Sequence, residues 1–172
     1  MRAYIASHFF NDAMFHWTEA LASYLEEHTD LTLYVPQRND DINDKATNDA
    51  TITAVGIAEA DTMELKKADL LIACIDGLTI DDGVAGEIMG FGIMAELEEE
   101  YAIEGRRPRR ILGIYTDMRA EGTGDNRLYR NQMIVGKIQQ HGKVLVAYPG
   151  KDVFPKVVAA VEELIAEMKD AH

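Results

Sequence analysis

The sequence predicts a three-layer, doubly wound α/β domain (flavodoxin/Rossmann-like) around a five-stranded parallel sheet. Short apolar runs alternate about five times with longer stretches of helical spacing. The run LLIACID is apolar without alternation, as expected of a central parallel strand covered on both faces. The chain has 172 residues, 47% of them hydrophobic, which suits one such domain. We therefore expect residues 1–172 to form a single domain.

The five predicted strands are short runs ending at polar or turn-forming residues. They cover residues 3–7, 31–36, 70–76, 110–117 and 143–149. The second ends at a proline, which cannot continue a sheet interior. Right-handed crossovers would place helices on both faces of this sheet.

The predicted helices follow the strands in alternation. They cover residues 11–27, 50–69, 82–102, 126–142 and 153–169. Asn11 or Asp12 is a suitable N-cap for the first, and Gly56 is a possible interruption in the second. Gly142 has the position of a C-cap after the fourth. The polar segment 37–49 is expected to be a loop.

Composition excludes several function classes. The formal charge of −13 argues against binding to a phosphate backbone. The basic cluster Arg106, Arg107, Arg109 and Arg110 precedes an apolar run and is expected to be a solvated loop. The single cysteine, Cys74, rules out an intrachain disulfide and is expected to be buried. No segment resembles a signal peptide or a membrane span, so we expect a cytoplasmic protein without a membrane partner.

The carboxyl edge of the predicted sheet, where ligands bind in such folds, is rich in carboxylates. Asp76, Asp81, Asp82 and Glu87 follow the third strand, and Asp61 lies in the preceding helix. The sequence has no Cys/His cluster for zinc, no phosphate loop, no GxGxxG after the first strand and no GxSxG elbow. Two kinds of site are left: one that uses carboxylates for chemistry at a sugar carbon, and one that holds a metal through oxygen ligands.

Two carboxylates in unequal environments are the working groups of glycosyl transfer. Glu87, near a helix start, is expected to be held ionised by the helix dipole and nearby amides, as a nucleophile requires. Gly83 and Gly86 would let a ligand approach the backbone closely. The structural interpretation of the same DDG stretch is a helix cap and a turn. The spacing alone supports this interpretation at least as well as a catalytic one.

Several segments, in order, resemble the nucleoside 2-deoxyribosyltransferase family. They are YIASHFFND, YVPQRND, AEADTMELKKADLLIACIDG and, most specifically, DDGVAGE. The resemblance covers most of the chain and implies transfer of a 2-deoxyribosyl group between nucleobases. It implies a covalent glycosyl–glutamate intermediate, net retention, and no metal or cofactor.

Carried over residue by residue, the resemblance places the nucleophile at Glu87. It places the acidic partner at Asp81 or its neighbour Asp82, and a further aspartate at Asp61. Tyr4 corresponds to a tyrosine that holds the nucleophile. Residues expected to contact substrate are Phe10, Asn39, Asp40, Asp82, Gly83 and, from a neighbouring subunit, Asn131. Without the resemblance, Tyr4 would be interpreted as a core aromatic.

The resemblance also implies partners. The substrates would be 2′-deoxyribonucleosides and free nucleobases, and the protein would be a homo-oligomer, a hexamer assembled from dimers. One departure is Met89, where the family usually has a glycine two residues after the glutamate. The apolar helix around it could also pack against another subunit, together with Met133 and Ile134.

Two alternatives stay open. One is an N-glycoside hydrolase on the same scaffold, acting on nucleosides or deoxynucleotides. The segment ASHFFND has no arginine or glycine pair to bind a phosphate, which favours a nucleoside substrate. The other is a non-catalytic nucleotide-binding module, in which loss of Glu87 would leave function intact.

Overall fold

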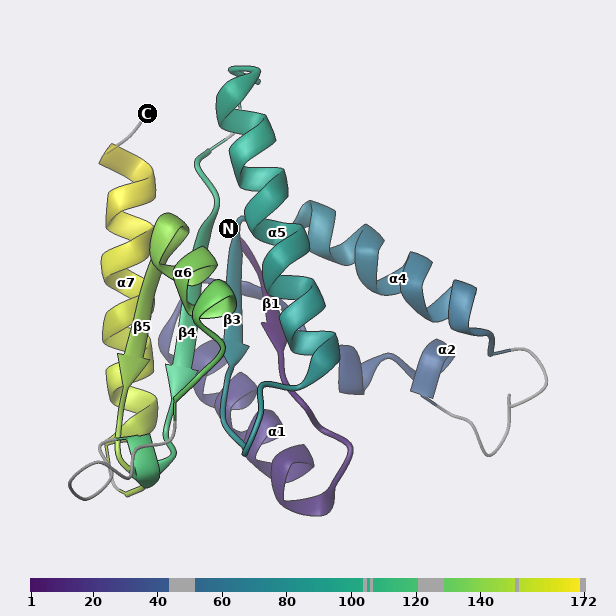
Figure 1. The fold of residues 1–172 in the computed structure, drawn as a ribbon, viewed down its shortest axis with the longest axis vertical. Coiled ribbons are helices and arrows are strands. Elements are labelled where there is room, and N and C mark those ends of the chain that lie inside the picture. Colours follow the sequence, from purple (N-terminus) through teal and green to yellow (C-terminus); the bar gives the residue numbers. More distant parts are fainter. Residues whose placement is uncertain (44–51, 104, 106, 121–128, 151, 171–172) are drawn as a thin grey trace.

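The computed structural model describes residues 1–43, 52–103, 105, 107–120, 129–150 and 152–170 (Figure 1). In this part of the chain five parallel strands form one sheet in the order β2-β1-β3-β4-β5. The strands are β1 (Arg2–Ala6), β2 (Thr32–Tyr34), β3 (Leu70–Cys74), β4 (Arg110–Tyr115) and β5 (Gly142–Val146). This confirms the predicted fold class, and the strand order is that of flavodoxin-like folds.

The helices are α1 (Asp12–His28), α2 (Asp40–Asn43), α4 (Ala54–Lys67), α5 (Asp82–Glu100), α6 (Gln132–His141) and α7 (Val153–Asp170). Two 3₁₀ turns, η1 (Pro36–Arg38) and η2 (Met118–Ala120), follow β2 and β4. The prediction of a plain loop over residues 37–49 was therefore wrong for its first part, where η1 and α2 form. Residues 44–49 lie outside the described ranges.

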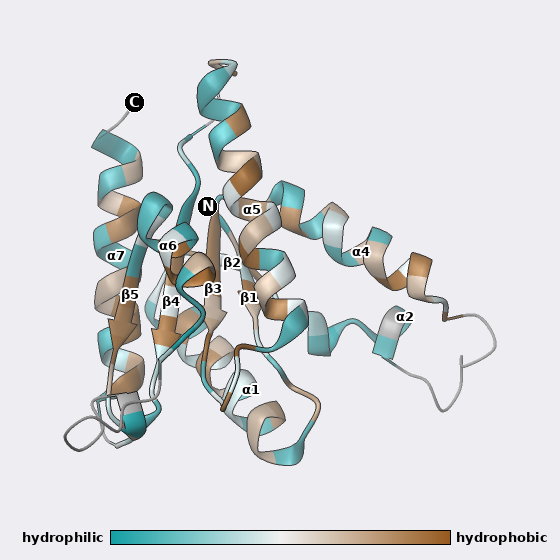
Figure 2. Ribbon diagram, viewed as in Figure 1, coloured by the Kyte–Doolittle hydropathy of each residue, from teal (hydrophilic) through white to brown (hydrophobic). Residues whose placement is uncertain are grey.

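Alternating strand residues build a separate core on each face of the sheet. Ile5, Ile72 and Leu112 face α1 and α7 in one buried cluster. Tyr4 and Leu71 face α4, α5 and α6 in the other. Figure 1 shows α5 and α6 in front of the strands, and Figure 2 shows the strands as the most hydrophobic elements. Cys74 is 2% exposed, which confirms that it is a buried apolar residue.

The helix α4 is the least embedded of the helices around the sheet. It begins after Thr53, whose hydroxyl accepts a hydrogen bond from the Gly56 N–H, so Gly56 does not interrupt it. Of its own residues only Leu65 is buried. Figure 1 shows α4 extending away from the sheet toward α2. Its position therefore depends on a few contacts.

The fourth predicted helix is shorter than expected. Residues 126–128 lie outside the described ranges, and α6 begins only after Asn131, whose side chain accepts hydrogen bonds from the amides of Met133 and Ile134. The preceding Arg130 is held outside the helix, because its buried guanidinium donates to the Gly77 carbonyl and the Tyr115 hydroxyl. Such partners, remote in sequence, override the helical pattern.

Gly142 is the C-cap of α6, as predicted, but its backbone is not left-handed. Its φ of 166° is extended backbone, and it is the first residue of β5. A Cβ atom there would lie 2.0 Å from the carbonyl oxygen of Ile111 on β4. The glycine is needed for this close approach of two backbones and not for a helix-ending turn.

The basic cluster before β4 is not uniformly solvated. Arg109 is 3% exposed, whereas Arg107 is exposed and Arg110 is partly buried; Arg106 lies outside the described residues. Arg109 donates to both carboxylate oxygens of Glu98 and to three carbonyls at the end of α4, those of Leu65, Lys66 and Ala68. The prediction of a solvated loop was wrong for this arginine, which joins α4 to α5.

Candidate active site

Three of the residues predicted from the sequence meet at the carboxyl side of β1, between β2 and β3: Tyr4, Glu87 and Asp61. Tyr4 is the third residue of β1, in register with Tyr34 on β2 and Leu71 on β3. The connections from β1 and β3 leave toward opposite faces at this point, and doubly wound folds bind their ligands where this happens. Glu87 reaches the same place from α5.

Tyr4 and Glu87 form the central contact. The Tyr4 side chain is fully buried, and its hydroxyl donates to Oε1 of Glu87 at 2.5 Å. That distance is typical of a hydroxyl donating to an ionised carboxylate. Tyr4 is thus both a core aromatic and a hydrogen-bond donor, so the two interpretations offered for it are compatible.

Glu87 does not lie at the helix start. It is the sixth residue of α5, and the free amides of the first turn, Gly83 and Val84, donate to Asp81 instead. Burial above all, together with the nearby charges of Asp61 and Asp81, raises the pKa of Glu87 to about 7 against the hydrogen bond from Tyr4. The expectation that a helix start holds this group ionised was therefore wrong.

Asp61 approaches the pair from α4. Its Oδ1 accepts a hydrogen bond from the Tyr34 hydroxyl at 3.2 Å, and Nδ2 of Asn39 donates to that hydroxyl at 3.0 Å. Burial raises the pKa of Asp61, while the Tyr34 hydrogen bond lowers it. Two carboxyl groups with raised pKa values in one crevice are a signature of an acid–base site.

Asp81 is the N-cap of α5, and its Oδ1 accepts from the amides of Gly83 at 3.0 Å and Val84 at 3.2 Å. Asp82 is exposed, and its Oδ1 also accepts from Gly83. The capping interpretation of DDG is therefore correct as a description of structure. The other oxygen of Asp81 is not used by the cap.

The sequence pattern of the nucleoside 2-deoxyribosyltransferase family matches residues 3–133, most of the chain. The chain belongs to this family. No curated protein sequence matches it significantly. Among solved structures, a conserved protein from Enterococcus faecalis V583 shares 26% identity at a TM-score of 0.72, with 95% of this chain and 98% of that one aligned.

Two solved enzymes share the fold at lower identity. The 2-deoxyribosyltransferase from Bacillus psychrosaccharolyticus has 18% identity and a TM-score of 0.54, over 92% of this chain and 90% of that one. The 2-deoxyribosyltransferase from Leishmania mexicana has 19% identity and a TM-score of 0.54, over 96% and 97%. The family is one of enzymes, so the crevice around Glu87 is the candidate active site.

The remaining positions carried over from the nucleoside 2-deoxyribosyltransferases lie on the surface. The Phe10 side chain is 77% exposed in the loop after β1, against Phe9 at 4.9 Å between ring centroids. Asp40 is exposed at the first residue of α2, and Asn131 is exposed at the N-cap of α6. Each is available to a ligand or to another chain.

Met89, which replaces the glycine usual in this family, packs partly buried against the core cluster beneath α5. Phe91 and Ile134 are buried and Met94 packs against the same cluster, so these three belong to the core. Met133 is 67% exposed and keeps its predicted place on an outer surface.

The sequence patterns missed Tyr34, which joins Asp61 to Asn39. The signal for it was its place as the last residue of β2, beside Tyr4 in a parallel pair. The role of Asp76 was also missed. Its carboxylate accepts from the amides of Thr116 at 2.6 Å and Asp117 at 3.0 Å, and from the Thr116 hydroxyl. Asp76 therefore joins the ends of β3 and β4 and is not a free carboxylate.

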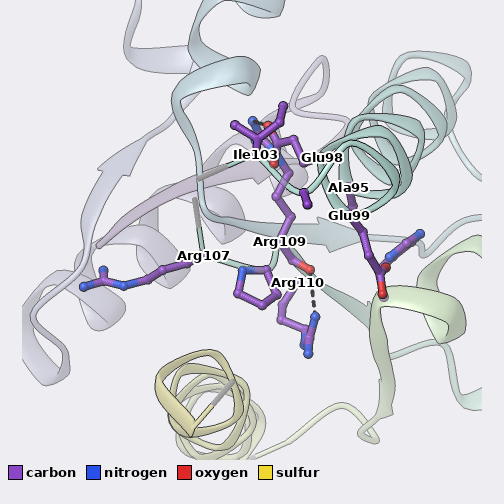
Figure 3. A pocket seen from close by; sticks show the side chains of 10 residues that line it. Ala95, Glu98, Glu99, Ile103, Arg107, Arg109 and Arg110 are labelled. Carbon is purple, nitrogen blue, oxygen red and sulfur yellow. Dashed lines mark hydrogen bonds and ion pairs between the residues drawn. The ribbon is translucent and has the colours of Figure 1, made fainter. Parts of the chain in front are cut away.

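Within the described ranges, no three His, Cys, Asp or Glu side chains are grouped as metal ligands, and no helix is long and apolar enough to cross a membrane. A cleft of about 410 Å³ lies at the opposite, amino edge of the sheet, between the end of α5 and the start of β4 (Figure 3). Arg109 and Glu98 line this cleft (Figure 3), and the guanidinium of Arg109 donates a hydrogen bond to the carboxylate of Glu98. The cleft is separate from the crevice that holds Glu87.

Proposed function

We propose that the protein exchanges the nucleobase of 2′-deoxyribonucleosides through a covalent 2-deoxyribosyl–Glu87 intermediate. The observation that carries this proposal is the buried contact of Glu87 with Tyr4 at the ligand-binding edge of the sheet, in a chain of this family. A carboxylate that is oriented by one donor and partly shielded from water is suited to attack a carbon.

In the first half-reaction, a Glu87 carboxylate oxygen attacks the anomeric carbon C1′. The C1′–N bond to the base breaks, and its electron pair stays on the base nitrogen. A proton supplied by a second carboxyl group neutralises the departing base. The 2-deoxy sugar favours this step, because no electron-withdrawing 2-hydroxyl opposes positive charge at C1′.

In the second half-reaction, a nitrogen of the incoming base attacks C1′ from the face opposite Glu87. The ester bond to Glu87 breaks and returns its electron pair to the carboxylate. The base gives up its proton to the same carboxyl group that served the first step. Two inversions at C1′ give net retention.

Asp61 is our choice for the proton-transferring group. Burial raises its pKa, which favours the protonated form that a proton donor needs. Asp81 already uses one oxygen to cap α5. We assign Asp81 to binding and orienting the sugar, with Asp82 and Gly83 beside it, and Phe10 and Asp40 to the base.

A chromatographic time course with deoxyinosine, with and without adenine, tests the proposal. Deoxyadenosine that forms only when adenine is present supports base exchange. Hypoxanthine and free deoxyribose released at a rate indifferent to adenine would indicate the hydrolase instead. If no product forms, thymidine and deoxycytidine are tried as donors, and failure with these too would contradict the proposed activity.

Replacing Tyr4 with phenylalanine should make catalysis more sensitive to acid. The reactive form of Glu87 is ionised, and the lost hydrogen bond stabilised that form, so the pKa of Glu87 should rise above about 7. We expect kcat/KM at pH 6 to fall by roughly tenfold, as for loss of a hydrogen bond to a charged group, with less loss at pH 8.

The measurement is the pH dependence of kcat/KM for both proteins. Tyr24→Phe is the matched control, because Tyr24 lies on α1 and stacks on His28, on the other face of the sheet. An acid limb that does not move in Tyr4→Phe would show that Tyr4 has no influence on the ionisation of the nucleophile.

We also propose that the active form is a homo-oligomer, a hexamer assembled from three dimers, with Asn131 of one chain reaching the sugar bound by another. In support, α5 exposes the apolar side chains Ile93 and Leu97, its C-cap Tyr101 is exposed, and Met133 is exposed close to Asn131 in sequence. Light scattering should give a mass near six times 19.2 kDa. A monomeric mass with full activity would contradict a shared site.

A further inference from the structure

A hydrogen-bonded chain of three side chains, from Asn39 through Tyr34, ends at the candidate proton donor Asp61. Tyr34 ends β2, and its ring lies against that of Tyr4 with centroids 5.2 Å apart. Its hydroxyl accepts from Asn39 at 3.0 Å and donates to Asp61 at 3.2 Å. The chain thus links the turn after β2, the strand edge and α4.

The direction of each hydrogen bond is determined by chemistry. Nδ2 of Asn39 can only donate, and its Oδ1 already accepts from the Asp41 amide at 3.2 Å. The hydroxyl oxygen of Tyr34 is therefore the acceptor, which leaves its proton for Asp61. Burial raises the pKa of Tyr34 to about 12, so the hydroxyl keeps that proton across the working pH range.

In the described part of the chain, the ionisable groups that interact with Asp61 are Tyr4 on β1, Tyr34 on β2 and Glu87 on α5. On α4 itself, Glu64 acts on Tyr34. Glu64 is neutralised by ion pairs with Arg2 and with Lys67. Among the residues that the structure describes, only Tyr34 donates a hydrogen bond to Asp61. Tyr34 therefore favours ionised Asp61 against the effect of burial.

We propose that Tyr34 is a positioning residue that fixes the orientation of the Asp61 carboxyl group and holds it closer to ionisation, with Asn39 acting through Tyr34. This inference rests on the proposed function for its catalytic consequence. It also revises the expected role of Asn39, because both ends of its amide group are engaged within the protein.

A purely packing role for Tyr34 makes a different prediction. Phenylalanine would fill the same space beside Tyr4, and neither Asp61 nor the pH profile would change. The positioning role predicts that Tyr34→Phe raises the pKa of Asp61. Because Asp61 must be protonated to serve the leaving base, the alkaline limb of kcat/KM should then move to higher pH.

The experiment is a carbon-13 NMR titration of the side-chain carboxyl groups, with the Asp61 signal assigned by its loss in Asp61→Asn. We expect an upward shift of the Asp61 pKa in Tyr34→Phe and a smaller one in Asn39→Ala. Where Asp61 carries its proton in both proteins, below the alkaline limb, we expect kcat to fall about fivefold in Tyr34→Phe, because the carboxyl group loses one ordinary hydrogen bond that fixes its orientation.

Tyr24→Phe removes an equivalent hydroxyl on the opposite face of the sheet and should leave the titration and the pH profile unchanged. An Asp61 pKa in Tyr34→Phe equal to that of the parent would overturn the inference. The titration needs no substrate, so absence of base exchange in the parent would contradict the proposed function separately, without deciding the positioning role.

Discussion

Replacing Glu87 with glutamine should lower the rate of base exchange by roughly 10⁴-fold or more, as for loss of a covalent nucleophile. The amide has nearly the shape of the carboxylate and can still accept a hydrogen bond from Tyr4, so the core should be preserved. It cannot form the ester to C1′. The loss should appear in kcat, because substrate binding does not require the carboxylate charge.

The measurement is the deoxyinosine–adenine exchange rate, together with the intact mass of protein mixed with deoxyinosine alone. The parent should show a 2-deoxyribosyl adduct that Glu87→Gln lacks. Glu99→Gln is the matched control, because Glu99 is an exposed glutamate on the same helix. Activity in Glu87→Gln within tenfold of the parent would eliminate Glu87 as the nucleophile.

Replacing Arg109 with methionine should reduce the free energy of unfolding by about 3–5 kcal/mol, the usual cost of breaking a buried ion pair. The Arg109 side chain is 2% exposed and that of Glu98 is 18% exposed. The substitution leaves Glu98 without this partner, and three carbonyls at the end of α4 lose their donor. The contact of the guanidinium with the Phe91 ring, 5.0 Å from the centroid, is also lost.

Urea unfolding followed by circular dichroism measures this effect. Arg110→Met is the control, because the adjacent Arg110 pairs with the more exposed Glu167 at 3.6 Å, a pair worth about 0–1 kcal/mol. Equal destabilisation by the two substitutions would show that the buried pair contributes no more to the free energy of unfolding than the exposed pair. In the double variant with Glu98→Gln, the loss should be smaller than the sum of the single losses.

The sheet could be predicted from the sequence because each strand is marked by a local pattern of residues. Each strand is a short apolar run, and residues such as Leu71 and Ile72 face opposite cores through simple alternation. The helix around residues 126–142 was mispredicted because Arg130 is held by Gly77 and Tyr115, which are distant in sequence. A helical pattern does not report such partners.

The site, too, could be predicted only in part, because some of its features depend on contacts between segments distant in sequence. Glu87, Tyr4 and Asp61 were found by resemblance, and the structure brings them together. The raised pKa of Glu87 was not foreseen, because burial depends on what covers a residue and not on its place in a helix. Tyr34 was missed because its importance arises from strand register, which pairs it with Tyr4 across β1 and β2.

The small buried surface of α4 affects how the protein responds to denaturant. A helix that buries one of its own residues contributes little to the global free energy of folding, and such elements open at lower free-energy cost than the sheet. Its amides should therefore exchange hydrogen faster than those of β3. Because Asp61 is carried by α4, mild denaturant should displace the proposed proton donor while the sheet and the Tyr4–Glu87 contact persist, so that activity is lost before the fold.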